Sequence, residues 1–179
     1  MCIGYFVTNE MYYGGPVGWA EMMIKSPAGQ PGKQEFRRFL ERRYRTVAAL
    51  NHAWGKSYSG FDAFLNDDQP PETAAGKRDL EEFSRILIRK FFAVSRDVLK
   101  AVAPNHLFLG SRFQMSAGAA YDFLAELFPE YCDVASYNCY WLGLDHFAPQ
   151  IPDMPVMITE FSVGGAFTRG LFYSSLSVS

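Results

Sequence analysis

Two short apolar segments near opposite ends of the sequence each run into a glutamate. The first covers residues 2–8 and leads into Asn9 and Glu10, and the second covers residues 155–159 and leads into Glu160. Each has the length and apolar composition of a buried parallel strand. Two carboxylates that separate strands carry into one cleft are the minimal apparatus for cleaving a glycosidic bond. The pair therefore predicts glycosidase chemistry, with Glu10 and Glu160 as the catalytic residues.

The elements that must position this pair alternate along the chain. We expect strands at residues 2–8, 106–110, 132–137 and 155–159, helices at residues 33–54, 78–102, 119–128 and 144–150, and a long loop at residues 11–31. Such alternation indicates an α/β fold with a parallel sheet. In a (β/α)8 TIM barrel the carboxyl ends of all eight strands meet at one face, where the active site lies. We therefore expect a partial TIM barrel. A four-stranded doubly wound sheet is the alternative, but no glycine fingerprint for a nucleotide follows the first strand.

The composition is that of a folded domain without a charge bias. The 179 residues are 49% hydrophobic and 20% charged, with a formal net charge of −2, which fits one domain with a sizeable core. Basic and acidic residues are interleaved, so we expect no nucleic acid and no membrane as a partner. The sequence has no zinc spacing, phosphate-binding loop or nucleophile elbow, and we expect neither a metal ion nor a cofactor.

Several motifs, taken in order, resemble a known group of glycosidases. They are Thr8-Asn9-Glu10, Phe39-Leu40-Glu41-Arg42-Arg43-Tyr44 continuing to Trp54-Gly55, the segments 109–113 and 132–140, and residues 155–161 with Arg169-Gly170-Leu171-Phe172 downstream. Together they are similar to retaining glycoside hydrolases of clan A, which are built on the (β/α)8 barrel. The similarity is greatest to the family 50 β-agarases and extends to the family 42 β-galactosidases. Thr8 stands where the agarases carry an aspartate, which loosens the substrate assignment.

The resemblance implies a role for each glutamate. Glu10 corresponds to the general acid/base, Asn9 to the residue that hydrogen-bonds the sugar 2-hydroxyl, and Glu160 to the nucleophile on the seventh barrel strand. The chain then corresponds to roughly strands four to seven with their helices. We accordingly expect residues 1–179 to form one partial catalytic domain that lacks the first strands and the last one.

Other residues near the ends of the predicted strands are candidate substrate contacts. Glu160 must stay ionised to attack, so it needs hydrogen-bond donors, for which Arg112 and Tyr140 are the candidates. Asn138 lies on the same face as Tyr140 if strand alternation continues. Two alternatives stay open. Arg112 could instead bridge structural carboxylates, and Trp141 could be either a sugar platform or a lid over the core.

Two functions of different classes follow from these features. The first is a retaining glycosidase that acts on a β-galactosidic polysaccharide such as agarose. The second is a catalytically incompetent barrel fragment with at most a carbohydrate-binding or structural role, because half a barrel presents half a cleft and exposes strand edges. A homo-oligomer could complete the barrel, and we expect weak or no hydrolysis by the chain alone. The family suggests a secreted or periplasmic protein, although no signal peptide is visible.

Overall fold

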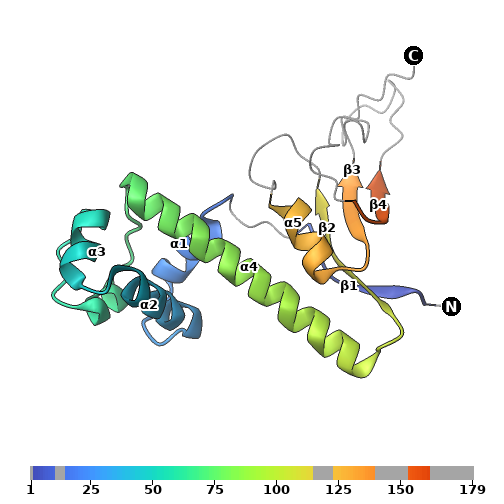
Figure 1. Ribbon diagram of the computed structural model, residues 1–179, viewed down its shortest axis with the longest axis horizontal. Coiled ribbons are helices and arrows are strands. Elements are labelled where there is room, and N and C mark those ends of the chain that lie inside the picture. The colour runs from blue at the N-terminus through green and yellow to red at the C-terminus, as the bar shows by residue number, and fades with distance from the viewer. Residues whose placement is uncertain (1, 11–14, 115–122, 140–152, 162–179) are drawn as a thin grey trace, which may run out of the picture. The chain divides into compact units, whose positions relative to one another are not determined.

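The computed structural model describes residues 2–10, 15–114, 123–139 and 153–161 (Figure 1). The chain divides into two compact units. We call residues 1–12 and 92–179 the sheet unit, and residues 13–91 the helical unit. The long helix α4, Ala74–Val102, contributes its first part to the helical unit and its last part to the sheet unit.

The sheet unit contains one sheet of four parallel strands. They are β1 (Gly4–Asn9), β2 (Leu107–Gln114), β3 (Ala135–Cys139) and β4 (Val156–Phe161), hydrogen-bonded in the order β1-β2-β3-β4 (Figure 1). The α/β prediction is confirmed, and an all-parallel sheet of this kind is what part of a TIM barrel contains. The register pairs Asn9 with Arg112 across β1 and β2, and Asn138 with Glu160 across β3 and β4.

The second strand is longer than its sequence suggests. We expected it to end at Gly110, but β2 continues to Gln114. Gly110 has a φ of 67°, a left-handed conformation that glycine adopts without a steric penalty. Arg112 therefore lies inside a strand, and Glu160 likewise lies inside β4.

Aromatic rings join the sheet to the helices of the same unit. Phe92 of α4 packs on Phe108 and Phe113 of β2, with ring centroids 6.3 and 6.0 Å apart. Phe128 of α5 (Leu124–Tyr131) contacts Phe113 at 5.5 Å and Tyr137 of β3 at 5.2 Å. All five side chains are buried. Each buried ring stabilises the fold by roughly 2–3 kcal/mol, so this cluster holds β2 and β3 against their helices.

The helical unit contains more helices than we expected. It comprises α1 (Gly18–Lys25), α2 (Pro31–Tyr44), α3 (Val47–Trp54), a short 3₁₀ helix η1 (Phe61–Asn66) and the first part of α4. The predicted loop at residues 11–31 thus holds a helix. The helix predicted at residues 144–150 lies outside the described residues. Among the helices that the structure describes, none has the length and apolar character needed to cross a membrane.

The single helix predicted at residues 33–54 is wrong, because the structure has two. Arg45 ends α2 with a φ of 64°, and the side chain of Thr46 accepts the backbone N–H of Ala49 at 3.2 Å to begin α3. The apolar periodicity continues across this break because Phe36 of α2 and Trp54 of α3 pack on each other in one core. Periodicity alone therefore could not separate the two helices.

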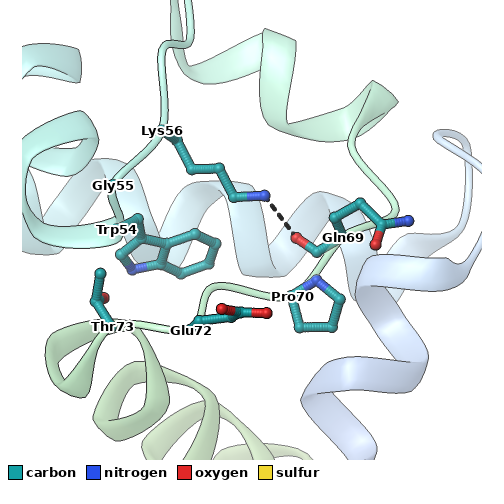
Figure 2. A pocket seen from close by; sticks show the side chains of 7 residues that line it. All are labelled: Trp54, Gly55, Lys56, Gln69, Pro70, Glu72 and Thr73. Carbon is teal, nitrogen blue, oxygen red and sulfur yellow. Dashed lines mark hydrogen bonds between the residues drawn. The ribbon is translucent and has the colours of Figure 1, made fainter.

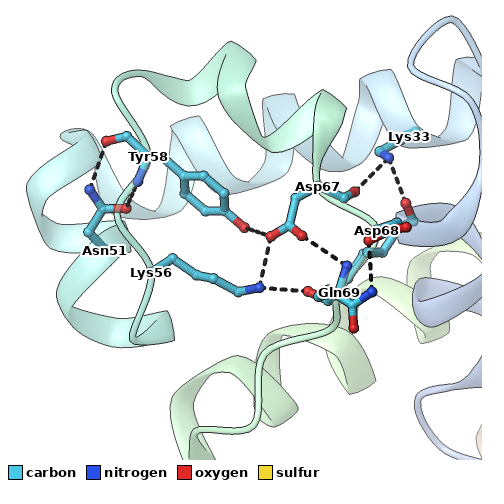
Figure 3. A network of polar contacts seen from close by, with 8 residues as sticks. Lys33, Asn51, Lys56, Tyr58, Asp67, Asp68 and Gln69 are labelled. Carbon is cyan, nitrogen blue, oxygen red and sulfur yellow. Dashed lines mark hydrogen bonds and ion pairs between the residues drawn. The ribbon is translucent and has the colours of Figure 1, made fainter.

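A buried lysine connects three elements of the helical unit (Figure 3). Lys33 is 2% exposed, and its ammonium group donates to the backbone oxygens of Ile24 at 2.5 Å, Ser26 at 3.0 Å and Asp67 at 2.8 Å. Burial lowers the pKa of Lys33, although Asp67 and Asp68 act in the opposite direction. One side chain thus joins α2 to the end of α1 and to the residue after η1.

A buried carboxylate connects the remaining helices of the same unit. Asp79 of α4 is 1% exposed, and it accepts hydrogen bonds from the Tyr44 hydroxyl at 2.5 Å and the Trp54 indole at 2.7 Å, and pairs with Arg43 at 2.8 Å. Burial, and after it the Asp79 carboxylate, raise the pKa of Tyr44 to about 12. The tyrosine is therefore a hydrogen-bond donor at neutral pH.

Candidate active site

Both predicted catalytic glutamates lie at the carboxyl edge of the sheet. Glu10 follows the last residue of β1, and Glu160 is the residue before the last of β4. Because all four strands are parallel, their carboxyl ends lie along the same edge. β2 and β3 supply Arg112 and Asn138 between the two outer strands. The fold thus brings together residues that stand 150 positions apart in the sequence.

Arg112 contacts both glutamates. Its backbone oxygen accepts the N–H of Glu10 at 2.8 Å, and its guanidinium group pairs with Oε1 of Glu160 at 2.9 Å. The guanidinium carbon also lies 5.5 Å from the centre of the Phe6 ring, a distance at which an aromatic face attracts a cation. The Arg112 and Glu160 side chains are only 29% and 32% exposed, so solvent screens this ion pair less than one at an open surface.

Asn138 links Glu10 to the other strands. Its side-chain nitrogen donates to Oε1 of Glu10 at 2.9 Å and to Oδ1 of Asn9 at 3.2 Å, while its oxygen accepts the Thr159 hydroxyl at 2.7 Å. Asn138 is 0% exposed, and buried polar groups of this kind are costly unless they are paired. The side chain therefore holds Asn9, Glu10 and Thr159 in one hydrogen-bonded group.

The backbone of Glu10 adopts an uncommon conformation. Its φ is 45°, in the left-handed region that few residues other than glycine visit. Such conformations persist where the surroundings over-determine them, and they cluster at functional sites. Here the N–H bond to Arg112 and the side-chain bond from Asn138 hold the residue. Glu10 is thus held by both its main chain and its carboxylate.

The two carboxylates have different described neighbours. The cationic guanidinium of Arg112 lies beside Glu160. The side-chain amide of Asn138 donates to Glu10. In the part of the chain that the structure describes, no three histidine, cysteine or acidic side chains are grouped to hold a metal ion.

Two of the predicted substrate contacts, Tyr140 and Trp141, lie outside the described residues. Two other residues enter the site that the sequence reasoning did not name. Thr159 bonds Asn138, and Phe6 faces the Arg112 guanidinium. The signal for Thr159 was its place beside Glu160 in the same strand. The sequence did not indicate Phe6 as a site residue, because a phenylalanine in an apolar strand is usually interpreted as a core residue.

A separate pocket lies in the helical unit (Figure 2). Its volume is about 360 Å³, and it is lined by Trp54, Gly55, Lys56, Gln69, Pro70, Glu72 and Thr73. Trp54 is only 2% exposed and so offers no open ring face for a sugar. Lys56 is bonded to the backbone oxygen of Gln69 (Figure 2), and Thr73 to that of Ala53. Among the residues that line this pocket in the described part of the chain, one, Glu72, carries a carboxylate. The pocket therefore lacks a pair of carboxylates like Glu10 and Glu160 at the edge of the sheet.

Comparison with known families identifies the chain's relatives. The family model of the glycoside hydrolase 42 group, described as β-galactosidase, matches residues 23–163. The chain belongs to this family. The matched segment includes α2, α4 and three of the four strands of the sheet. It also includes Glu160.

Individual relatives include both β-agarases and β-galactosidases. Beta-agarase A from Vibrio sp. (strain JT0107) is 30% identical over 202 residues, which cover 94% of this chain and 19% of that protein. A β-galactosidase from Thermus thermophilus is 30% identical over 132 residues, covering 68% of this chain and 19% of its own length. The resemblance to both groups is thereby confirmed. The chain spans about 19% of the length of these relatives.

Solved structures give the same relationship. The structure of an exo-β-agarase superimposes on 91% of this chain, with a TM-score of 0.77 and a sequence identity of 32%. The superimposed part is 24% of the agarase structure. A second agarase gives a TM-score of 0.72 at 25% identity over 89% of this chain and 24% of its own. The sheet and helices described above are therefore shared with agarases.

Proposed function

We propose that this chain carries both carboxylates of a retaining glycosidase, with Glu10 as general acid/base and Glu160 as nucleophile. The observation that carries the proposal is the double contact of Arg112, whose main chain bonds Glu10 and whose side chain pairs with Glu160. It links the two glutamates at one edge of the sheet. Family membership supports a glycoside as the substrate.

The proposed reaction has two steps. In the first, the Glu160 carboxylate attacks the anomeric carbon, the glycosidic C–O bond breaks, and Glu10 gives its proton to the leaving oxygen. In the second, Glu10 takes a proton from water, the water oxygen attacks the same carbon, and the bond to Glu160 breaks. Configuration at the anomeric carbon is retained because it is inverted twice.

The proposed substrate is a β-galactosidic polysaccharide such as agarose. Relatives named β-agarases match nearly the whole chain, at 94% and 97% coverage. Relatives named β-galactosidases match less of it, at 68% for two of them. Agarose and β-galactosides share the β-galactosidic bond, so both sets of relatives support that linkage. We further propose that Asn9 contacts the sugar 2-hydroxyl, and that Tyr140 and Trp141 contact the substrate.

A trapping experiment tests the role of Glu160. We expect incubation with an activated 2-fluoro-β-galactoside to add one fluorosugar to the protein, and peptide mass spectrometry to locate it on Glu160. The Glu160→Gln variant should remain folded by circular dichroism and acquire no adduct. An adduct on another carboxylate, or none on a wild-type protein that hydrolyses the parent galactoside, would contradict the assignment.

A stereochemical experiment tests retention and the role of Glu10. Proton NMR of the first product should show the β-anomer before mutarotation. Glu10→Gln should lower kcat/KM on a substrate with a poor leaving group by about 10²–10⁴-fold. Added azide should rescue this variant on an activated aryl galactoside and give a β-galactosyl azide. Initial formation of the α-anomer would instead indicate an inverting enzyme.

An alternative function has its own supporting observation. Several apolar side chains of β1 and β4 are exposed, among them Phe161 at 65% and Val7 at 37%. Outer strands of this kind fit a chain that keeps the architecture of a barrel without a complete cleft. We infer that the chain by itself hydrolyses agarose weakly or not at all, and that a homo-oligomer could complete a barrel-like assembly. Robust turnover by a purified monomer, with its mass verified by light scattering, would overturn this alternative.

A further inference from the structure

We propose that Thr159 is a positioning residue that sets which oxygen of Glu10 carries the catalytic proton, and that it acts by fixing the side-chain amide of Asn138. The inference rests on the proposed function, in which Glu10 transfers a proton. Its own basis is the hydrogen-bonded series Thr159–Asn138–Glu10, which joins β4, β3 and the end of β1.

The first step is the contact between Thr159 and Asn138. The Thr159 hydroxyl lies 2.7 Å from Oδ1 of Asn138 and 3.0 Å from the backbone oxygen of Tyr137. It carries one hydrogen, and the shorter distance favours the amide oxygen as its acceptor. A side-chain amide has one accepting end and one donating end. A hydroxyl that donates to Oδ1 therefore determines which way the Asn138 amide points.

The second step is the cost of turning that amide round. Its nitrogen lies 2.9 Å from Oε1 of Glu10 and 3.2 Å from Oδ1 of Asn9. A rotated amide would place its own oxygen against both of these acceptors. Asn138 is 0% exposed, so water is not at hand to satisfy the unmatched groups, and unmade hydrogen bonds of buried groups are expensive. The Thr159 hydroxyl thus reinforces the one orientation in which the amide donates to Glu10.

The third step concerns the Glu10 proton. Because an N–H of Asn138 is directed at Oε1, that oxygen is an acceptor whether the carboxyl group is ionised or protonated. This contact favours a proton on Oε2, where the proton does not compete with the Asn138 N–H for the same oxygen. The acid/base function requires the same oxygen to give the proton to the leaving group and to take one from water. Thr159 accordingly holds the proton in one place through the whole cycle.

The arrangement also redefines the role of Asn138. Its oxygen accepts from Thr159, and its nitrogen donates to Asn9 and Glu10, so one acceptor site and both donor hydrogens are engaged within the described residues. Asn138 then acts on the reaction through Glu10 and not by binding the sugar. This replaces the substrate contact that its position in the strand predicts.

Nuclear magnetic resonance tests the positioning without any catalysis. The side-chain amide signals of Asn138, identified by their absence in Asn138→Asp, should move when Glu10 ionises in a pH titration, and that movement should be lost in Glu10→Gln. In Thr159→Val, which removes the hydroxyl but keeps the shape, the movement should be largely lost. Thr159→Ser, which restores the hydroxyl, should recover it.

A matched control separates this effect from the loss of any strand hydroxyl. Thr8 also carries a part-buried hydroxyl, bonded to the Ser111 hydroxyl at 2.6 Å, and Thr8→Val should leave the Asn138 signals and their titration as in the wild type. Unchanged Asn138 signals in Thr159→Val would overturn the proposal, as would equal changes in Thr8→Val. If Thr159→Val does not fold, loss of the movement in Thr159→Ser, with the movement kept in the wild type, would equally contradict it.

Kinetics connects the positioning to proton transfer. With a poor leaving group, kcat/KM of Thr159→Val should fall about 10–100-fold, whereas an activated aryl galactoside that needs no proton should lose less than about threefold. An equal fall for both substrates would overturn the positioning role. If Glu160 is not trapped by the fluorosugar but the Asn138 signals respond as expected, the proposed function fails while the Thr159–Asn138–Glu10 series stands.

Discussion

At the scale of single residues, side chains of this protein act through fixed neighbours. Arg112 illustrates this, because Glu160, the N–H of Glu10 and the Phe6 ring all contact it. Both alternatives that the sequence left open for Arg112 place it beside a carboxylate, and in the structure that carboxylate is Glu160. Arg112 lies in a strand whose course depends on a glycine two residues earlier, and that glycine yields a prediction.

Gly110→Ala should destabilise the protein by about 2–5 kcal/mol. The residue has a φ of 67°, which costs an L-residue roughly 1–2 kcal/mol. An added Cβ would also lie 2.6 Å from Cys132 Sγ and 3.2 Å from a Phe92 ring carbon, and overpacking of a core adds about 1–3 kcal/mol. Urea denaturation followed by circular dichroism measures the loss.

Gly60→Ala is the matched control for this substitution. Gly60 has extended backbone, with a φ of −172°, and nothing lies within 4 Å of an added Cβ there. We expect a change of less than about 0.5 kcal/mol, as at most sites without a packing role. Equal effects of the two substitutions would show that the close approach of β2 to Cys132 and Phe92 is not a constraint.

At the scale of elements, the helical unit is held by polar groups as well as by its aromatic core. Lys33 joins α1, α2 and the residue after η1, and Asp79 joins α2, α3 and α4. Breaks between helices need such partners, since the carbonyls at a helix end lack hydrogen bonds within the helix. The Lys33 ammonium supplies three donors where backbone oxygens converge.

Lys33→Met should therefore cost roughly 2–3 kcal/mol of unfolding free energy. Methionine keeps the length of the side chain but leaves the backbone oxygens of Ile24, Ser26 and Asp67 without this donor, and buried acceptors without a partner are costly. Thermal unfolding measured by calorimetry should show a lower Tm. Lys25→Met, at an exposed position of α1, serves as the control and should change Tm little. A Lys33→Met protein as stable as wild type would mean that the ammonium group stabilises nothing.

At the scale of the whole molecule, each unit contains a carboxylate whose ionised form is stabilised by folding. In the helical unit, burial would raise the pKa of Asp67, but Lys56, Tyr58 and the N–H of Gln69 outweigh it and hold the pKa below the ordinary value (Figure 3).

In the sheet unit, burial likewise acts to raise the pKa of Asp133. Lys100 and the backbone N–H of Phe108 donate to its carboxylate at 2.8 and 2.7 Å, and they lower the pKa overall. Folding therefore favours the ionised form of one carboxylate in each unit.

These two carboxylates predict an acid limit to stability. A pKa that is lower in the folded than in the unfolded chain contributes stability above the unfolded value of about 4, and the contribution is lost as pH falls through the folded pKa. The unfolding free energy should accordingly decrease with falling pH below about 4. Urea titrations at pH 2–7 measure it.

Substitution of these residues tests the source of the acid limit. Asp67→Asn and Asp133→Asn should each reduce the slope of the unfolding free energy against pH. The reductions should add in the double variant, because the two residues share none of their hydrogen-bond partners. A slope unaffected by either substitution would place the acid sensitivity elsewhere.

The sequence by itself determined the order of the four strands along the chain, the parallel sheet, and the positions of Glu10 and Glu160 at or near the carboxyl ends of β1 and β4. These features depend on local composition and on the spacing of apolar residues, which are written directly into the chain. The sequence did not predict helix α1 or the break at Arg45, because the spacing of apolar residues indicates which residues face a core and not where the backbone turns. Only the tertiary structure decided that Arg112 pairs with Glu160 and that Thr159 reaches Glu10 through Asn138. Those contacts join residues up to 128 positions apart, and they depend on strand register, which no local pattern of residues contains.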